Sequence, residues 1–328
     1  MLESPVDHQP DSLLTTAQRR RVGVIGGGQL AWMMADAAKL LNVDLVVQTP
    51  SDCDPAVAIA TQTILAPVAD AQGTAQLAAH CDVITFENEF VDLTALRQLA
   101  QQGICFRPSL EALDPLLDKF YQRSFLKNLG LPTPVFTAVT AEEMERTTSA
   151  SFPLVLKTRR HGYDGQGTFI VRNSTDLQSV LPRLKTVPLL LEEFVPFERE
   201  LAVMAARSVD GEVVIYPVVE TKQQNQVCRW VIAPAEVSSA VIDQVEAIAQ
   251  TILTSLEVVG VFGIELFLTA SGSVLVNEIA PRTHNSGHFT LDACKTSQFE
   301  QQLRSVCGLP LGSPLMITDG ALMVNLLG

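Results

Sequence analysis

Residues 277–288 read NEIAPRTHNSGH and place a carboxylate, an arginine, two histidines and an amide within a few positions of one another. The preceding stretch, GVFGIELFLTASGSVLVNEIA, consists of two alternating runs that meet at Ser271 and Gly272. This pattern predicts a β-hairpin, because glycine tolerates the positive φ angle of a tight turn. With those two residues as the turn, paired positions have a constant sum, so Glu265 is expected directly opposite Glu278.

The two facing glutamates indicate a cation site. Like charges directly opposite each other destabilise paired strands, so we expect a cation between the carboxylates. Ligands that are all oxygen atoms favour a hard cation such as Mg²⁺ over zinc. The basic and amide side chains that follow would then meet an anion. In the alternative interpretation, the two glutamates are solvated on the outer face of an edge hairpin.

The composition is typical of a globular protein of two or three domains, with 328 residues of which 47% are hydrophobic and 18% charged. No apolar run approaches the ~20 residues of a membrane span, so we expect a soluble protein with no membrane contact. The formal net charge of −13 opposes nucleic-acid binding, which needs a basic surface. The six cysteines lack C-x-x-C spacing, which argues against a disulfide framework and a zinc site.

The amino-terminal part predicts a leader followed by a glycine-rich turn. Residues 1–20 are polar without an apolar signal core, so we expect a flexible leader and a cytoplasmic protein. Residues 21–31, RVGVIGGGQLA, predict a strand, a glycine turn and a helix that continues to Leu41; the amino end of such a helix favours an anion. A dinucleotide site would need an acid about 20 residues further on. Gln48 stands there, so a nicotinamide-dependent oxidoreductase is kept only as an alternative hypothesis.

The next segments alternate between strand and helix patterns, which predicts an α/β domain with an open parallel sheet. Extended segments are expected near 63–66, 82–90 and 104–106, with helices near 74–79 and 109–129. Glu87 and Asn88 stand where the second of these strands would end. Ligands enter open parallel sheets at that edge, although a plain polar loop is the alternative.

Residues 151–173, SFPLVLKTRRHGYDGQGTFIVRN, predict two strands around a loop rich in glycine and charge. Lys157 ends the first strand, and successive N–H groups of such a loop can bind phosphate. The alternative is a mobile surface hairpin. A buried apolar strand then runs into Glu192 and Glu193, where main-chain groups could pair with an adenine edge, and Glu200 could accept from ribose hydroxyls.

Together, Lys119, Lys157, HGYDGQG, LEEFV, GIELF and NEIAPRTHNSGH resemble the ATP-grasp superfamily, and within it the 5-(carboxyamino)imidazole ribonucleotide synthetases of purine biosynthesis. The resemblance runs from about Arg21 to Gly328. It implies an ATP-grasp fold with a flexible leader (1–20), an amino-terminal Rossmann-like domain (21–118), a small α+β lid (119–190) and a carboxy-terminal α+β ATP-binding domain (191–328).

The resemblance also implies roles for individual residues. Contacts to ATP are expected from Lys119, Lys157, Gly162, Tyr163, Asp164, Gly165, Gln166, Gly167, Glu192, Glu193, Phe194, Val195, Glu200, Asn277 and Glu278. Magnesium ligands are expected to be Glu265 and Glu278. The residues that orient bicarbonate, and the carboxyphosphate formed from it, are expected to be Arg282, His284 and Asn285. The ribonucleotide is expected to contact Gly28, Gln29, Leu30, Glu87, Asn88 and Arg304.

The implied activity is ATP-dependent carboxylation of 5-aminoimidazole ribonucleotide by bicarbonate, with ATP and Mg²⁺ as cofactors and a homodimer as the assembly. Bicarbonate is a poor electrophile, so its oxygen first takes the γ-phosphoryl group. Alternatives are another ATP-grasp ribonucleotide ligase or formyl transferase, and an inactive nucleotide-binding form.

Two departures from the family pattern stand out. Ala31 and Trp32 replace the glycine and arginine of the usual G-Q-L-G-R-M. Members also continue beyond the closing N-L-L-G into a basic segment that helps bind the ribonucleotide phosphate. The sequence ends at this point, so we expect ribonucleotide binding to be limited.

Overall fold

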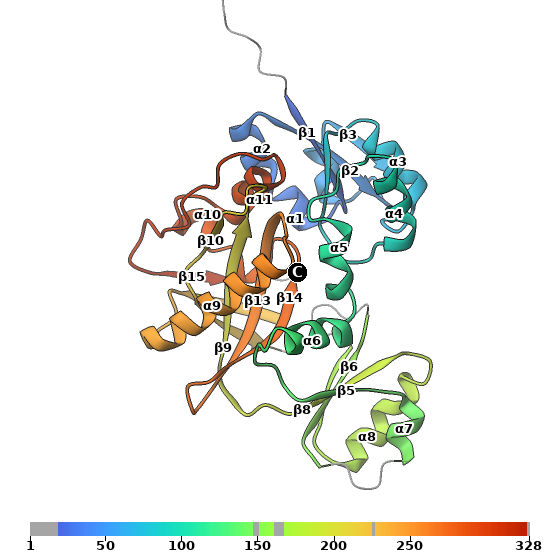
Figure 1. The fold of residues 1–328 in the computed structure, drawn as a ribbon, viewed down its shortest axis with the longest axis vertical. Coiled ribbons are helices and arrows are strands. Elements are labelled where there is room, and N and C mark those ends of the chain that lie inside the picture. Colours follow the sequence, from blue (N-terminus) through green and yellow to red (C-terminus); the bar gives the residue numbers. More distant parts are fainter. Residues whose placement is uncertain (1–18, 147–150, 161–166, 225–226, 327–328) are drawn as a thin grey trace, which may run out of the picture.

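The computed structural model of the chain describes residues 19–146, 151–160, 167–224 and 227–326. Within these residues the strands form three sheets, each accompanied by its own helices (Figure 1). The first sheet lies at the top of Figure 1 and the second at the bottom, with the third beside and between them. Among the described helices, none has the length and apolar character needed to cross a membrane.

The first sheet is parallel and has the strand order β3-β2-β1-β4, which confirms the predicted open parallel sheet. Its elements are β1 (Arg20–Ile25), α1 (Gln29–Trp32), α2 (Ala35–Leu41), β2 (Val43–Thr49), β3 (Gln62–Leu65), α3 (Ala71–Ala78), β4 (Val83–Phe86) and α4 (Leu93–Gln101). Helices lie on both faces, because both faces of each central strand are apolar: Val22, Val24 and Ile25 of β1 are fully buried.

Three predicted elements of this part were wrong in extent. The helix expected up to Leu41 is divided into α1 and α2, and the strand expected at 104–106 is a single bridge between Ile84 and Phe106. The helix expected over 109–129 is divided into α5 (Leu110–Leu113), a 3₁₀ turn and α6 (Lys119–Asn128). The last division has a local cause, because the Asp118 side chain accepts from the Phe120 N–H and caps a new helix there.

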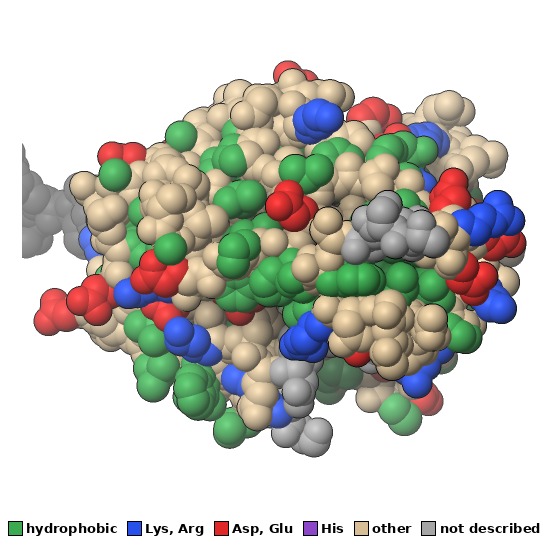
Figure 2. Space-filling model, turned by 90° about the horizontal axis from the view of Figure 1, so that it is seen from below, with side chains coloured by type: hydrophobic (Ala, Val, Ile, Leu, Met, Phe, Trp, Pro, Cys, Tyr) green, Lys and Arg blue, Asp and Glu red, His purple; other side chains and the backbone are tan. Residues whose placement is uncertain are grey.

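The second sheet forms the lid, with antiparallel strands in the order β5-β8-β6-β7. Its elements are β5 (Phe136–Val139), α7 (Ala141–Arg146), β6 (Leu154–Thr158), β7 (Thr168–Val171), α8 (Ser174–Val180) and β8 (Leu189–Glu193). The domain boundary expected after residue 190 falls inside β8, which pairs with both β5 and β6 up to Glu193. Seen from the end that carries the lid, hydrophobic side chains gather across the middle of the face, with basic and acidic side chains around them (Figure 2).

The third sheet has the order β14-β13-β9-β11-β12-β15, with β10 also paired to β9, and its pairs are antiparallel. Its elements are β9 (Phe197–Arg207), β10 (Val213–Ile215), β11 (Val219–Gln224), β12 (Val227–Ala233), α9 (Ser239–Ser255), β13 (Gly260–Thr269), β14 (Val274–Ala280) and β15 (Ala321–Val324). The amphipathic helix expected around 241–256 is confirmed as α9, which covers one face of this sheet (Figure 1).

Two helices lie near the carboxy end, and the second of them joins the third sheet to the first. They are α10 (Thr290–Ala293) and α11 (Gln298–Val306). Phe299 of α11 is fully buried in the core of the amino-terminal domain. The buried Gln302 side chain accepts from the Val261 N–H of β13 at 2.6 Å and donates to Thr85 Oγ1 of β4 at 2.8 Å. The amino-terminal sheet and the sheet that carries Glu265 are therefore joined by buried contacts.

The core beneath α9 is expected to limit the stability of the third sheet. Ile252 is fully buried between α9 and the sheet, so Ile252→Ala should lower the free energy of unfolding by about 2–5 kcal/mol. The exposed Glu246 on the same helix provides the control, since Glu246→Ala should change it by no more than about 0.5 kcal/mol. Urea unfolding followed by two probes measures both values; equal losses in the two variants would contradict this packing.

Candidate active site

A cavity of about 560 Å³ lies between the lid and the third sheet. Its walls come from α6, the lid strands β6 and β8, and one face of β9, β11, β13 and β14. Apart from Gly167, every described residue expected to bind ATP, hold magnesium or orient bicarbonate lines this cavity: Lys119, Lys157, Glu192, Glu193, Phe194, Val195, Glu200, Glu265, Asn277, Glu278, Arg282, His284 and Asn285. Residues 162–166, also expected to bind ATP, lie outside the described residues.

The hairpin of β13 and β14 confirms the expected pairing of Glu265 with Glu278, although the turn differs from the expected one. The Thr269 N–H donates to the Ser273 carbonyl at 3.0 Å, so three residues, 270–272, form the loop between this pair, with Gly272 at φ +80°. With that loop, Leu266 pairs with Val276, and Glu265 would pair with Asn277 if the register stayed constant. A bulge shifts the register between Glu265 and Leu266.

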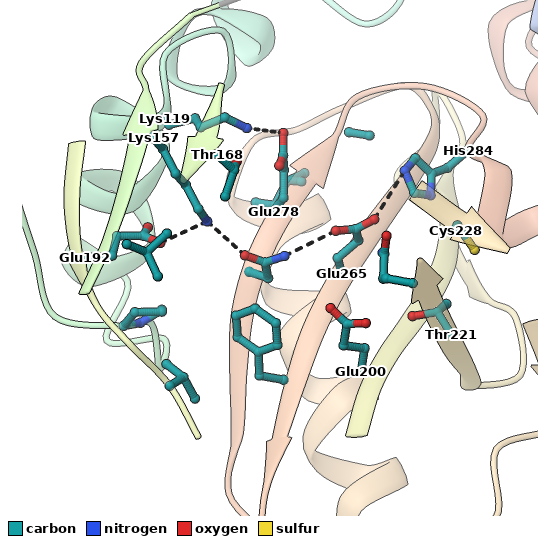
Figure 3. Close-up of a pocket in the computed structure, with 18 of the residues that line it drawn as sticks. Lys119, Lys157, Thr168, Glu192, Glu200, Thr221, Cys228, Glu265, Glu278 and His284 are labelled. Carbon is teal, nitrogen blue, oxygen red and sulfur yellow. Dashed lines mark hydrogen bonds and ion pairs between the residues drawn. The ribbon is translucent and has the colours of Figure 1, made fainter. Parts of the chain in front are cut away.

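The bulge determines what the hairpin presents to the cavity. Two residues of β14, Asn277 and Glu278, stand against Glu265, and a bulge re-aims side chains that would otherwise alternate between faces. All three side chains line the cavity. The Asn277 Nδ2 group donates to Glu265 Oε2 at 3.2 Å (Figure 3). One bulge therefore places two carboxylates and an amide together on the cavity floor.

Two lysines approach this floor from the lid side (Figure 3). The Lys119 Nζ group, at the start of α6, donates to Glu278 Oε1 at 2.5 Å. The Lys157 Nζ group, on β6, donates to Asn277 Oδ1 at 3.0 Å and pairs with Glu192 Oε2 at 2.9 Å. Both lysines are therefore placed where they can neutralise the phosphates of a bound nucleotide.

The start of α6 and the end of β6 are tied together. The Lys119 main-chain N–H donates to the Arg159 carbonyl at 2.9 Å, and the Arg159 guanidinium forms a two-pronged pair with the buried Asp118 carboxylate. Hydrogen bonds with Asp118, outweighing partial burial, raise the pKa of Arg159. Helix α6 and strand β6 thus meet at a fixed junction.

Arg123 was not anticipated from the sequence. Its side chain is 3% exposed, its Nε–H donates to Glu192 Oε1 at 2.6 Å, and a second N–H donates to the Asn277 carbonyl at 2.5 Å. The position one helical turn after Lys119 was the only available signal, because residues four apart lie on one face of a helix. Glu192, expected to contact ATP, lines the cavity but has both carboxylate oxygens paired with Arg123 and Lys157.

The carboxylates of the site differ in their affinity for protons. Burial, reinforced by Glu278 and Glu200, raises the pKa of Glu265 to about 7. Burial also acts to raise the pKa of Glu278, but the Lys119 ammonium outweighs it and the pKa of Glu278 is lowered. The pKa of Glu192 is lowered to about 2, because Lys157 and Arg123 overcome the effect of burial. The neighbouring carboxylates Glu278 and Glu200 therefore disfavour the ionised form of Glu265, and a bound cation would favour it.

The carboxylate oxygens of Glu265 and Glu278 suit a magnesium ion that is bound jointly with a nucleotide, rather than a metal ion held by protein ligands alone. In the described part of the chain, no three His, Cys, Asp or Glu residues come close enough to hold a metal. Glu265 and Glu278 supply two facing carboxylates, and Mg²⁺ in nucleotide sites is usually bound by one or two carboxylates together with substrate phosphates. The donor set therefore fits Mg²⁺ that arrives with a nucleotide.

The bicarbonate residues expected from the sequence lie at one end of the cavity. Arg282 Nε lies 2.9 Å from Glu89 Oε1, and Asn285 begins the 3₁₀ turn Asn285–Gly287. The His284 Nε2 atom lies 3.6 Å from Glu265 Oε1 (Figure 3). Gly263 of β13 makes room for His284, because an added Cβ would lie 2.6 Å from the histidine Cβ.

The hydrogen bonds of His284 indicate its tautomer. The Ser286 N–H donates to His284 Nδ1 at 3.4 Å, and the Ser286 hydroxyl lies 2.9 Å from the same nitrogen. An accepting Nδ1 leaves the proton on Nε2, which faces the cavity. Burial, with a further contribution from Arg282, lowers the pKa of His284 to about 3, so the ring is a neutral N–H donor at neutral pH.

The residues expected to bind the nucleoside line the opposite end. Glu193 ends the lid strand β8, Phe194 and Val195 follow it, and the rings of Phe197 and Phe267, which also line the cavity, stack at 4.7 Å. Burial raises the pKa of Glu200 to about 7, and Lys222 opposes this shift. The cavity therefore combines an aromatic end, a charged floor and an anion-orienting end.

The residues expected to bind the ribonucleotide do not line this cavity. Four of them meet at the glycine turn, where the Glu87 carboxylate accepts from the Gly28 N–H at 2.7 Å and the Leu30 N–H at 3.1 Å, with Gln29 between them. Glu87 is followed by Asn88 at the end of β4. Arg304 lies on α11, where its guanidinium pairs with Glu300.

Ala31 and Trp32, which depart from the family pattern, lie beside this turn. Ala31 is buried and its N–H also approaches Glu87, whereas the Trp32 side chain is 47% exposed. Gln48, which replaced the acid of a dinucleotide site, is buried and bonded to the Pro67 carbonyl and to Thr74, so it has a packing role.

Comparison with known protein families gives two adjacent matches. The ribonucleotide synthetase preATP-grasp domain matches residues 19–115, and the ATP-grasp domain matches residues 124–299. The first covers the parallel sheet, and the second covers the lid together with most of the sheet that carries the cavity floor.

Comparison with individual proteins gives a finer assignment. N5-carboxyaminoimidazole ribonucleotide synthase of Synechococcus elongatus is 61% identical over 312 residues, which cover 94% of this chain and 78% of the relative. The synthase of Synechocystis is 55% identical, with 94% and 80% covered. Phosphoribosylaminoimidazole carboxylase of Ogataea methanolica is 40% identical, with 94% of this chain and 58% of the relative covered.

Solved structures agree with this assignment. N5-carboxyaminoimidazole ribonucleotide synthetase of Thermotoga maritima superimposes with a TM-score of 0.84 at 42% identity, covering 94% of this chain and 81% of that structure. The Aspergillus clavatus synthase, solved with ADP and 5-aminoimidazole ribonucleotide, gives 0.87 at 34% identity, covering 94% and 82%. The chain therefore belongs to the N5-carboxyaminoimidazole ribonucleotide synthase family of the ATP-grasp superfamily.

Proposed function

We propose that the chain catalyses ATP-dependent carboxylation of 5-aminoimidazole ribonucleotide by bicarbonate, with release of ADP and phosphate, in purine biosynthesis. The observation that carries this proposal is the bulged hairpin, which sets Glu265, Asn277 and Glu278 against Lys119 and Lys157 across one cavity. Family membership supports the choice of substrates, since a synthase of 34% identity has been solved with ADP and this ribonucleotide.

The first step is transfer of the γ-phosphoryl group. A bicarbonate oxygen attacks the γ-phosphorus, the bond to the ADP oxygen breaks, and carboxyphosphate forms. Such a transfer requires positioning and charge neutralisation more than covalent participation of the protein. Lys119 and Lys157 supply positive charge on the lid side, and Arg282 with the His284 Nε2–H orients the bicarbonate.

The second step transfers the carboxyl group. The exocyclic amine of the ribonucleotide attacks the carboxyl carbon of carboxyphosphate, or the CO₂ that it releases. Phosphate leaves, and the amine nitrogen loses a proton. Because these intermediates react readily with water or escape, exclusion of water by the lid suits the reaction.

The remaining roles follow from the same cavity. Glu193, Phe194 and Val195 would hold the adenine and Glu200 the ribose. Glu265 and Glu278, assisted by Asn277, would hold Mg²⁺, which when bound neutralises phosphate charge. Gly28, Gln29, Leu30, Glu87, Asn88 and Arg304 would contact the ribonucleotide, and residues 162–167 would close over the phosphates.

We also infer a cytoplasmic homodimer that acts on small molecules without nucleic acid or membrane, with an amino-terminal domain of 21–118 after a leader and a lid that ends with β8 at Glu193. The cytoplasmic assignment is supported by the cysteines, all of which belong to the described residues and are unpaired, as is usual in a reducing compartment.

Omission of each substrate in turn tests the reaction. Phosphate release from ATP should require Mg²⁺, bicarbonate and 5-aminoimidazole ribonucleotide together. Glu278→Gln should lower the rate by at least the roughly 10 to 100-fold that loss of metal-supporting groups causes, because it removes one facing carboxylate. The exposed Glu246 on α9 gives the control Glu246→Gln, which should retain the parent rate.

Two outcomes would contradict these assignments. Release that is independent of the ribonucleotide, or that proceeds with formate and glycinamide ribonucleotide instead, would reject the proposed substrates. A Glu278→Gln rate equal to that of the parent would reject the metal site.

The raised pKa of Glu200 predicts a dependence of stability on pH. Its folded pKa of about 7 exceeds the ordinary value of 4.5, so the folded protein holds a proton that the unfolded chain loses. This contribution is fully present below about pH 4.5 and is lost as the pH rises through 7. Glu200→Gln should therefore reduce the fall in melting temperature between pH 5 and pH 8 in the nucleotide-free protein.

Glu246→Gln serves as the control for this measurement, and its pH profile should match that of the parent. Part of the fall should persist in Glu200→Gln, because Glu265 has a raised pKa of about 7 as well. Identical profiles for Glu200→Gln and the parent would show that Glu200 is ionised in the folded protein at pH 5.

A further inference from the structure

The bulged residue Asn277 is held at both of its carbonyl oxygens by buried cations. Its main-chain oxygen accepts from Arg123 at 2.5 Å, and its side-chain Oδ1 accepts from Lys157 at 3.0 Å. The extra residue of a bulge is ordinarily left unpaired by the ladder. Two contacts that hold the bulge therefore come from outside the sheet, in addition to the one with Glu265 of β13.

The two cations are joined to each other by one carboxylate. Glu192 accepts from Arg123 Nε at 2.6 Å on one oxygen and pairs with Lys157 Nζ at 2.9 Å on the other, and the Arg123 and Glu192 side chains are each 3% exposed. Removing one partner of a buried charge pair leaves the other uncompensated. The buried Arg123, Glu192 and Lys157 and the half-buried Asn277 thus form one connected network between α6, the lid and β14.

We propose that Arg123 is a positioning residue for the metal and nucleotide site, acting through the Asn277 bulge and through Glu192. Fixing the Asn277 carbonyl holds the register in which Glu278 faces Glu265. Arg123 pairs with Oε1 of Glu192, and the other carboxylate oxygen, Oε2, is directed at Lys157. The inference rests on the proposed function, because it assigns Arg123 a role towards Mg²⁺ and ATP.

Arginine suits this position and lysine does not. The guanidinium reaches Glu192 through Nε and the Asn277 carbonyl through a terminal nitrogen, two donors in fixed planar geometry. A lysine in the same place could neutralise Glu192 but could not hold both acceptors with that geometry. Arg123→Lys therefore separates the charge of the residue from its control of the bulge.

The experiment compares Arg123→Lys and Arg123→Met with the parent and with Arg207→Met. Arg207 lies on the far part of β9, outside the cavity lining, and donates to the Val258 carbonyl at 3.0 Å, so it matches Arg123 in residue type and in its contact to a main-chain oxygen. Calorimetry measures ATP binding with Mg²⁺ and with EDTA. Amide hydrogen exchange of the ligand-free proteins reports on residues 276–280.

Both Arg123 variants should weaken ATP binding in Mg²⁺ by at least tenfold, and weaken it less in EDTA. The amides around the bulge should exchange faster than in the parent. Arg207→Met should lower the melting temperature without either change. If Arg123→Met does not fold, Arg123→Lys alone decides.

The inference would be overturned if the folded Arg123 variants bound ATP in Mg²⁺ with a dissociation constant within twofold of that of the parent. It would also be overturned if amide exchange around the bulge were unchanged. Arg123 would then be a packing residue. Because these readouts need neither bicarbonate nor ribonucleotide, they separate this result from failure of the proposed carboxylation. If the parent binds ATP with Mg²⁺ but shows no turnover, the proposed function is rejected. The binding and exchange measurements then still decide whether Arg123 positions the site.

Discussion

The arrangement of the site depends on one electrostatic constraint: Glu265 and Glu278 face each other across a strand pair and need positive charge between or beside them. In the ligand-free protein Lys119 partly meets this need by pairing with Glu278, while burial and two acidic neighbours raise the pKa of Glu265 to about 7. The negative charge of the two glutamates is therefore only partly neutralised by the protein, and Mg²⁺ bound with a nucleotide would neutralise the rest.

The same constraint explains why the lid is basic where it meets the floor. Lys119 and Lys157 come from α6 and β6, and the junction of Asp118 with Arg159 holds these two elements together. Positive charge from α6 and β6 and negative charge from β13 and β14 converge on one cavity, although the chain as a whole has a formal charge of −13. The ammonium groups of Lys119 and Lys157 can thus attract an anionic substrate to the cavity, although the net charge of the chain is negative.

Much of this could be predicted from the sequence, because local patterns determine it. The parallel sheet followed from alternating strands and helices, and the facing glutamates followed from a hairpin with a glycine turn. The helix expected over 109–129 was wrong because Asp118 caps a new helix inside it. The exact turn was also wrong, and Glu265 met Glu278 only because a bulge compensated for a loop one residue longer than expected.

The bulge and its supports could not be predicted, because they depend on contacts between distant segments. Arg123 and Asn277 are separated by 154 positions, and Arg123 and Glu192 by 69. Nothing in the alternation of β14 marks Asn277 as the extra residue; only the cations that arrive from α6 and β6 make that position favourable. Arg123 is not among the residues expected to contact ATP, magnesium or bicarbonate. Its place in the site can be recognised only once the fold brings Glu192 and Asn277 next to it.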